Sequence, residues 1–330
     1  MAITQSRYPG LRPFDTGEQQ NFFGRNEEIE ALCRLLDLDK LIVLHGPSGM
    51  GKSSLINAGI LPVLSNVRRW DVPFHIIKVR LTNYDPALAR IRRERSQGGQ
   101  DTELVKDPVD RFIEACLGSD HPWPEVFPLP KPSLWLAAKQ VLVDEQIQPM
   151  RLIFVLDQFE ELFTYPEERV NEFARQLGEL YHQVMPEAIR RGLARKEALE
   201  KEEDSKPPAP HVTELFETLE EPLDLKILIS MRSDKLHFLE RLKPFLPEMM
   251  LNSFELRSFD RDQARRAIVE PASLYSPDFD TPPFEISEPV LEEVIGFLED
   301  KLTRRIEPAQ LQIICQHLEK RMLRKAKKQK

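Results

Sequence analysis

Residues 46–53 form a glycine-rich cluster whose residue types and spacing suit the binding of phosphate groups. They read Gly-Pro-Ser-Gly-Met-Gly-Lys-Ser, which fits the pattern G-x-x-x-x-G-K-[ST]. The glycines let the backbone curl so that its N–H groups surround phosphate oxygens, and the following helix adds its positive N-terminus. We expect Lys52 to reach the β- and γ-phosphates of a nucleotide and the Ser53 hydroxyl to bind Mg²⁺. The expected contacts with the nucleotide here are Gly46, Pro47, Ser48, Gly49, Met50, Gly51, Lys52, Ser53 and Ser54.

Three acidic residues after a later apolar run are candidates for the chemistry of the same site. Asp157 directly follows the run Leu152–Leu156, so we expect it at the end of a strand, where it helps to hold Mg²⁺ against the phosphates. Glu160 and Glu161 come next, and one of them is a candidate for polarising the water that attacks the γ-phosphate. The alternative is that these acids, Asp157 included, only favour the start of a helix through its dipole.

An arginine completes the set of candidate catalytic residues. Arg232 lies just past the apolar run Leu225–Ser230. Ligands of parallel sheets bind at the edge where the strands end, so Arg232 is placed to contact the γ-phosphate. The alternative, that it pairs with Asp234 or with another surface acid, is equally consistent with the pattern.

Short apolar runs alternate with amphipathic stretches through the first three quarters of the chain. This alternation predicts an α/β fold in which helices wrap a parallel sheet. We expect strands at 41–44, 74–81, 152–156 and 225–230, and helices at 26–36, 54–60 and 170–184.

The strand pattern stops after about Phe254, and helical periodicity takes over. Three helices are predicted there, at 260–270, 290–298 and 311–322, with Asp260 as the cap of the first and Pro271 ending it. We therefore expect an N-terminal arm (1–25), a core (26–253) and a helical appendage (254–330). Within the core, 120–132 is expected to be an extended proline-rich loop. A charged insertion at about 186–211 is expected to be a solvated helix with a mobile tip.

Composition excludes several classes of protein. The 330 residues are 41% apolar and carry a formal net charge of −8, which excludes a wholly disordered chain. No apolar run approaches the roughly 20 residues of a membrane span. Three widely spaced cysteines exclude a disulfide framework, and the acidic balance speaks against a dedicated nucleic-acid binder. We expect a cytoplasmic protein.

Together these segments resemble a STAND-class P-loop NTPase, and its bacterial novel STAND group more closely than the NACHT or NB-ARC branches. The resemblance implies an AAA+-like fold of the ASCE type, with the C-terminal helices as a lid. It covers nearly the whole chain and is carried by Tyr8–Phe14, Phe22–Arg25, the loop 46–53, Asp157–Phe163, Met231–Asp234, Ala267–Ala272 and Glu307–Gln312.

The resemblance also implies which ligand is bound and by which residues. ATP or ADP with Mg²⁺ is the expected ligand, with Asp157 as the magnesium acid and Arg232 as the sensor of the γ-phosphate. Phe23, Gly24 and Arg25 are expected near the adenine, although Arg25 could instead form a surface salt bridge. Pro271 either touches the adenine or only ends its helix.

A molecular switch is the function that the resemblance implies. It would be closed with ADP, open and oligomerising with ATP, and timed by slow hydrolysis, often in defence or programmed-death signalling. Sensor and effector domains, expected in this class, are not visible in this sequence, and no membrane partner is expected.

Two other functions remain open from sequence. The first is an AAA+-like DNA-associated ATPase of the initiator or loader type, which shares these motifs but for which the acidic charge is unfavourable. The second is a nucleotide-binding scaffold without appreciable hydrolysis.

Overall fold

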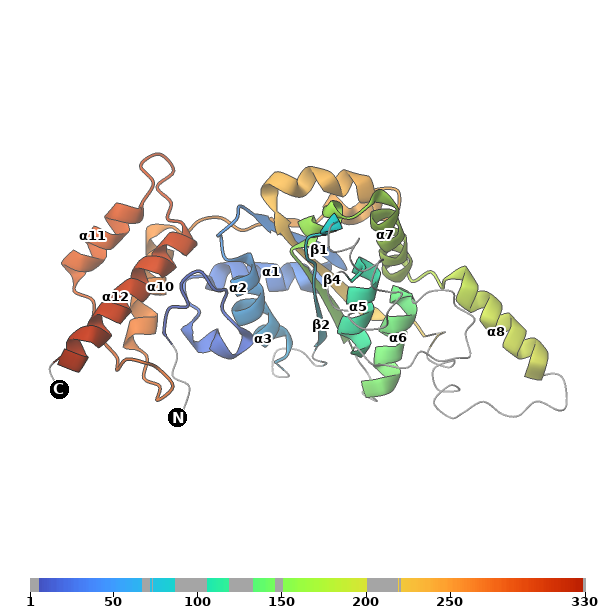
Figure 1. Ribbon diagram of the computed structural model, residues 1–330, viewed down its shortest axis with the longest axis horizontal. Helices are drawn as coiled ribbons and strands as arrows, with labels where there is room; N and C mark the ends of the chain where they lie inside the picture. The colour runs from blue at the N-terminus through green and yellow to red at the C-terminus, as the bar shows by residue number, and fades with distance from the viewer. Residues whose placement is uncertain are drawn as a thin grey trace.

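The computed structural model describes residues 6–66, 72, 74–86, 106–118, 133–145, 151–200, 219 and 221–328. In Figure 1 the described elements form an elongated body. The sheet and most of its helices occupy the middle and right of the view, and α10, α11 and α12 stand together at the left.

Five parallel strands make up the sheet, in the order β2-β3-β4-β1-β5. Three of them, β1, β3 and β4, are nearly continuous apolar runs because helices cover both faces of the sheet. The four predicted strands and the α/β fold class are confirmed. The short fifth strand was not predicted, since Ser253-Phe254-Glu255 contains no apolar run. The strands are Leu41–Gly46 (β1), Phe74–Arg80 (β2), Arg151–Asp157 (β3), Asp224–Arg232 (β4) and Ser253–Glu255 (β5).

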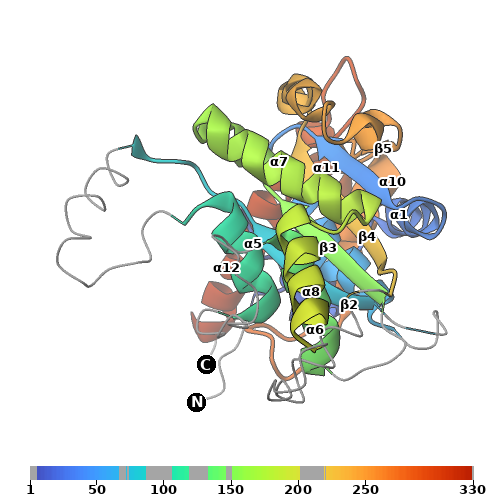
Figure 2. The same cartoon turned by 90° about the vertical axis from the view of Figure 1, so that its right-hand side faces the viewer.

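Side chains of the strands alternate between two apolar cores on opposite faces of the sheet. On β1, Leu41 and Val43 belong to one core and Ile42 and Leu44 to the other. Figure 2 shows α5 and α1 on opposite sides of the strands. The first core is completed by α5 (Pro108–Leu117), α6 (Leu134–Glu145) and α7 (Glu167–His182), and the second by α1 (Asn26–Leu38) and the helix after the loop 46–53.

The helix after the loop runs from Lys52 to Leu64 and changes type on the way. It begins as α2 (Lys52–Ser54), becomes π-helical over Leu55–Ile60, and ends as α3 (Leu61–Leu64). The predicted helix at 54–60 is therefore confirmed, but most of it is π-helical, which has more residues per turn than an α-helix. Such π segments often occur at functional sites.

The charged insertion contains the helix that was predicted for it. This helix, α8, spans Glu187–Glu200, whereas the predicted tip after residue 200 and the predicted loop 120–132 lie outside the described residues. Among the described residues, the core and the arm also contain the 3-10 helices Thr16–Asn21 (η1), Phe159–Thr164 (η3), Ser233–Leu242 (η4) and Pro247–Met250 (η5).

Residues 254–330, which we call the lid, contain the three predicted helices α10 (Arg261–Ser273), α11 (Glu288–Leu298) and α12 (Pro308–Lys328). Asp260 caps α10, accepting a hydrogen bond from the Gln263 N–H at 2.8 Å. The prediction that Pro271 ends this helix is wrong, because α10 continues to Ser273. The last turn is kept because its carbonyl groups find partners: that of Pro271 accepts from Arg7 Nη1, and that of Ala272 from the N–H of Phe284.

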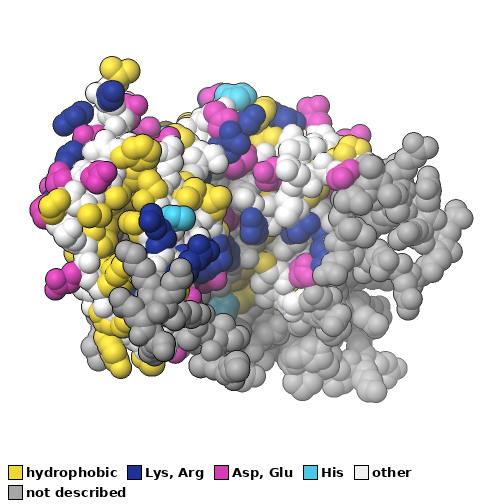
Figure 3. All heavy atoms as spheres, turned by 60° about the vertical axis from the view of Figure 1, so that its left-hand side comes forward, with side chains coloured by type: hydrophobic (Ala, Val, Ile, Leu, Met, Phe, Trp, Pro, Cys, Tyr) yellow, Lys and Arg dark blue, Asp and Glu magenta, His cyan; other side chains and the backbone are white. Residues whose placement is uncertain are grey.

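Several large apolar side chains of the lid are exposed. Hydrophobic atoms form a band over the left part of the face in Figure 3, the side on which the lid lies. Clusters of this kind commonly mark surfaces that another protein covers. No helix in the described part of the chain is both long and apolar enough to cross a membrane. The large apolar side chains exposed on the lid are Val269, Tyr275, Val290, Phe297, Leu302, Ile313 and Met322.

Two mid-helix glycines offer a test of the packing between α7 and the segment that follows η4. A Cβ on Gly178 of α7 would lie 2.7 Å from the carbonyl oxygen of Phe245, whereas a Cβ on Gly296 of α11 would meet nothing within 4 Å. Gly178→Ala should destabilise the fold by about 1–3 kcal/mol, because backbone must move. Gly296→Ala should stabilise it by up to about 1 kcal/mol through helix propensity. Urea unfolding of both variants measures the difference, and equal effects would contradict this packing.

Candidate nucleotide-binding site

The glycine-rich loop 46–53 begins where β1 ends, at the carboxyl edge of the sheet. Gly49 and Gly51 have φ angles of 82° and 86°, a backbone region that other residues adopt only with strain. These two turns let the loop double back before α2 begins at Lys52. The N–H groups of the first helical turn therefore face the same edge of the sheet as the ends of β3 and β4.

Lys52 is held inside the loop by backbone carbonyl groups. Its Nζ donates to the carbonyl oxygens of Gly46 at 2.8 Å and Pro47 at 3.0 Å. Burial lowers the pKa of this ammonium group, and the carboxylates of Glu160 and Asp157 act in the opposite direction. A phosphate group offers Lys52 stronger, charge-assisted acceptors than these two neutral carbonyls.

Asp157, the last residue of β3, meets the loop through the hydroxyl group of Ser53. Its buried Oδ1 accepts from Ser53 Oγ at 3.3 Å and from the Gln158 N–H at 3.1 Å. The Nζ of Lys78, on the neighbouring strand β2, lies 3.6 Å from Oδ2. A carboxylate beside a hydroxyl group supplies the hard oxygen ligands that Mg²⁺ prefers, so the pair fits the predicted role.

Glu160 and Glu161 lie in the first turn of η3, which begins at Phe159 directly after Gln158. The Oε2 atom of Glu160 is buried and has no hydrogen-bond partner among the described residues. The pKa of Glu161 is raised by burial and by the neighbouring charge of Glu160, while Arg232 and Lys235 oppose the shift. Both glutamates start a helix and also line a cavity, so the two alternatives for them are not exclusive.

Arg232 ends β4, where it is aligned with Gly46 of β1. It forms a two-pronged ion pair with Asp234, with Nε–Oδ1 at 3.0 Å and Nη2–Oδ2 at 2.9 Å. The arginine side chain is 44% exposed and lines the same cavity as the glutamates. The structure thus shows the predicted alternative pairing and also places Arg232 beside the loop.

A cavity of about 470 Å³ unites these groups with the arm and the lid. Its volume lies within the range of small-molecule sites, roughly 300–1,000 Å³. The lining residues predicted from sequence are Phe23, Arg25, Ser48, Gly49, Met50, Gly51, Lys52, Ser53, Ser54, Asp157, Glu160, Glu161 and Arg232. Those that sequence reasoning missed are Gly10, Leu11, Arg12, Pro13, Phe14, Asn21, Phe22, Gln158, Ser230, Phe259, Ala267, Pro308, Ala309 and Gln312.

Four predicted site residues do not line this cavity. Gly46 and Pro47 instead direct their carbonyl groups to Lys52. Gly24, with φ of 83°, packs against α10, where a Cβ would lie 2.5 Å from the carbonyl oxygen of Gln263. Pro271 accepts a hydrogen bond from Arg7 and lies apart from the cavity. Most of the missed residues belong to the motifs at 8–14 and 307–312. Residue spacing alone could not show that these motifs line the cavity.

Arg25 joins the arm to both the core and the lid. Its side chain is only 2% exposed, so the expected alternative of a surface salt bridge does not describe it. Nη1 pairs with Glu28 at 2.5 Å, Nη2 donates to the carbonyl oxygen of Arg257 at 2.9 Å, and the guanidinium lies 4.1 Å from the centre of the Phe259 ring. Burial lowers the pKa of Arg25, and Glu28 offsets part of that cost.

A phosphate-binding loop after the first strand, an acid at the end of a nearby strand and a parallel sheet define a P-loop NTPase. The Novel STAND NTPase 1 family matches residues 8–296, and the chain belongs to this family. Among curated proteins no significant match was found.

Several solved structures are similar to this chain at low sequence identity. A Walker-type ATPase of Pyrococcus abyssi is 15% identical, with a TM-score of 0.46 over 92% of this chain and 69% of that one. The ORC2 protein of Aeropyrum pernix, in ADPNP–ADP complexes, is 12% identical, with a TM-score of 0.48 over 93% and 62%. The ORC1 protein of the same organism, in complex with DNA, is 13% identical, with a TM-score of 0.45 over 91% and 61%. This chain therefore spans 61–69% of the length of these chains, and the likeness concerns the fold alone.

Replacing Arg25 tests how much its buried contacts contribute. Arg25→Met should lower the free energy of unfolding by about 3 kcal/mol, because Glu28 would lose the partner of its charge. Arg257→Met is the matched control, since Arg257 pairs with Glu255 at an exposed site and should contribute less than about 1 kcal/mol. Urea unfolding compares the two. Similar losses would mean that the Arg25 contacts add nothing beyond an ordinary surface pair.

Proposed function

We propose that this chain binds ATP and ADP with Mg²⁺ and hydrolyses ATP slowly, as the nucleotide-dependent module of a signalling switch. The observation that carries the proposal is the cavity in which the loop 46–53, the pair Ser53–Asp157, the arm and the lid all meet. Binding at such a place lets the chemical state of a nucleotide influence how the lid sits on the core.

In this proposal the phosphates are held by the loop and by Lys52, which exchanges the carbonyls of Gly46 and Pro47 for phosphate oxygens. Ser53 and Asp157 hold Mg²⁺, whose charge offsets that of the phosphates. Arg232 leaves Asp234 to contact the γ-phosphate, a move that costs little because the ion pair is half exposed.

We assign the activation of water to Glu160 rather than to Glu161. Glu160 has a buried carboxylate oxygen without a partner and is the strongest of the charges acting on Lys52. Glu161 interacts with Arg232, as Glu160 also does, and with Lys235. As water attacks the γ-phosphorus, Glu160 takes its proton while the bond to the β-phosphate oxygen breaks.

The lid supports the part of the proposal that concerns switching. It contributes Phe259, Ala267, Pro308, Ala309 and Gln312 to the cavity, so its position and the nucleotide state depend on each other. We propose an ADP-bound closed form and an ATP-bound open form that self-associates in the cytoplasm, in defence or programmed-death signalling. The exposed apolar side chains of the lid supply a surface for such association.

The first test is to denature the purified chain and identify the nucleotide that it releases. The wild type should release ADP or ATP in near-stoichiometric amount, because lid and arm both enclose the cavity. Lys52→Ala should release none, since it removes the cation that binds the phosphates. Lys301→Ala, on an exposed loop of the lid, is the control and should behave as the wild type. A loaded Lys52→Ala variant would contradict the proposed site.

The second test separates the two glutamates. Glu160→Gln should lower ATP turnover about 100-fold or more with little change in ATP affinity, because it removes the proton acceptor. Glu161→Gln should lower turnover less than tenfold. Single-turnover hydrolysis and equilibrium binding measure both effects. The reverse order would move the role to Glu161, and turnover insensitive to both would favour a nucleotide-binding scaffold.

A further inference from the structure

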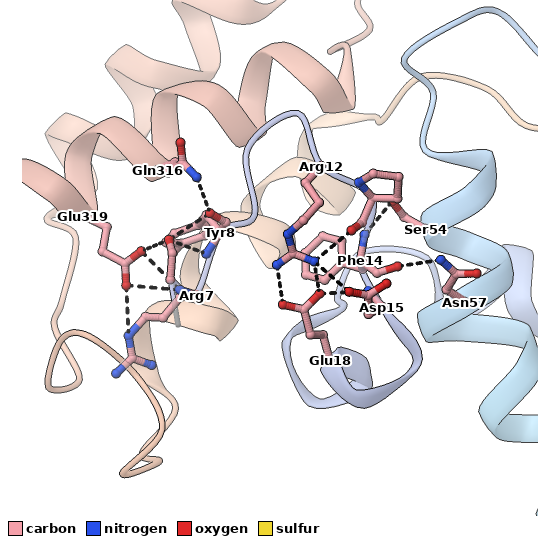
Figure 4. Close-up of polar contacts among 12 residues, drawn as sticks. Arg7, Tyr8, Arg12, Phe14, Asp15, Glu18, Ser54, Asn57, Gln316 and Glu319 are labelled. Carbon is pink, nitrogen blue, oxygen red and sulfur yellow. Dashed lines mark hydrogen bonds and ion pairs between the residues drawn. The ribbon is translucent and has the colours of Figure 1, made fainter. Parts of the chain in front are cut away.

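The arm is anchored in the lid by a fully buried arginine that lies outside the cavity. The guanidinium of Arg7 donates to the carbonyl oxygens of Pro271 at 2.9 Å, Leu274 at 2.7 Å and Thr281 at 2.7 Å. Its Nε donates to Thr281 Oγ1 at 3.0 Å and lies 3.8 Å from Glu319 Oε1. Arg7 thus connects three parts of the lid: the end of α10, the segment between α10 and α11, and helix α12. Figure 4 shows its contact with Glu319 of α12.

Neighbouring contacts make this anchorage extensive. Tyr8 is buried within the apolar core of the lid, and its hydroxyl group donates to the carbonyl oxygen of Ile268 at 2.5 Å. Gln316 of α12 donates to the carbonyl oxygen of Tyr8 at 3.2 Å. Glu319, only 1% exposed, also accepts from the backbone N–H of Arg7. The start of the arm therefore packs into the lid and is hydrogen-bonded to it.

A few residues later the same arm is bonded to the helix that follows the phosphate-binding loop. The N–H of Phe14 donates to Ser54 Oγ at 3.2 Å, and Asn57 Nδ2 donates to the carbonyl oxygen of Phe14 at 2.8 Å. Asn57 in turn accepts from Lys78 Nζ, whose ammonium group lies beside Asp157. This second anchorage connects the arm with the residues that would surround the phosphates.

The stretch between the two anchorages, residues 10–14, forms one wall of the cavity. The lid lines the same cavity, and a Cβ on Gly49 of the loop would lie 3.3 Å from Cβ of Ala309 in α12. A ligand in the cavity therefore touches the arm and the lid at once, and Arg7 holds the arm against the lid.

We propose that Arg7 is a positioning residue for the bound nucleotide: it makes the arm and the lid one body that closes over the cavity. The proposal rests on the nucleotide binding proposed above. A loosened anchorage would leave each wall free to move separately, so part of the binding free energy would be spent on ordering them. By linkage, the nucleotide should stabilise the anchored lid as much as the anchored lid stabilises the bound nucleotide.

Arg7→Lys is the sharpest test, because it keeps the charge beside Glu319 and loses the fork that reaches several acceptors. We expect it to weaken ADP binding roughly tenfold, measured with a fluorescent ADP analogue under conditions where the variant is folded. Hydrogen exchange should also show that ADP protects α12 less than in the wild type. Arg265→Lys is the matched control, since Arg265 makes a two-pronged pair with Glu288 within the lid but at an exposed site. It should change ADP affinity less than twofold.

A second variant covers the case in which Arg7→Lys does not fold. Asn57→Ala releases the arm at its other anchorage, outside the cavity lining, and should likewise reduce the protection of α12 by ADP. Folded variants that bind ADP and protect α12 as the wild type does would overturn the role of Arg7 while leaving nucleotide binding intact. A wild type that binds neither ADP nor ATP would overturn the proposed function and this inference together.

Discussion

The site depends on one constraint, the parallel register of β1, β3 and β4. Because all three strands run the same way, their last residues share one edge of the sheet. Gly46 lies opposite Arg232 in that register, and Asp157 ends the strand on the far side of β4. Both faces of the sheet are packed with apolar side chains, so a slip of one residue would bury polar groups and is strongly disfavoured. The spacing of loop, acid and arginine is therefore as rigid as the core itself.

The remaining walls of the cavity are built differently. They come from the arm and the lid, whose contacts with the core include polar ones such as Phe14 with Ser54 and Gln263 with Glu28. Polar junctions of this kind exchange more readily than packed cores, because water can replace their partners. The molecule thus combines a rigid phosphate-binding edge of the sheet with cavity walls that are able to move.

Much of the core could be predicted, because residues buried on both faces produce continuous apolar runs and the loop 46–53 carries its own spacing. The short strand β5 has no such run, and the helix α10 outlasts Pro271 because Arg7 and Phe284 satisfy carbonyl groups in its last turn. For the site, Ser53 and Asp157 were placed correctly beside each other, whereas the contributions of residues 10–14 and 308–312 were missed. Contacts between segments hundreds of residues apart leave no local periodicity, and only the folded chain reveals them.

The bond between Arg7 and Glu319 also bears on how the chain is made. Glu319 follows Arg7 by 312 positions, so the arm lacks this partner until 312 further residues have been synthesised. At about 5–20 residues per second, the arm waits roughly 15 to 60 seconds after it leaves the ribosome. The sheet can form during that time, but the cavity is enclosed only once the lid has been synthesised. A chain synthesised only as far as the sheet therefore carries the phosphate-binding loop without the part of the cavity wall that the lid contributes.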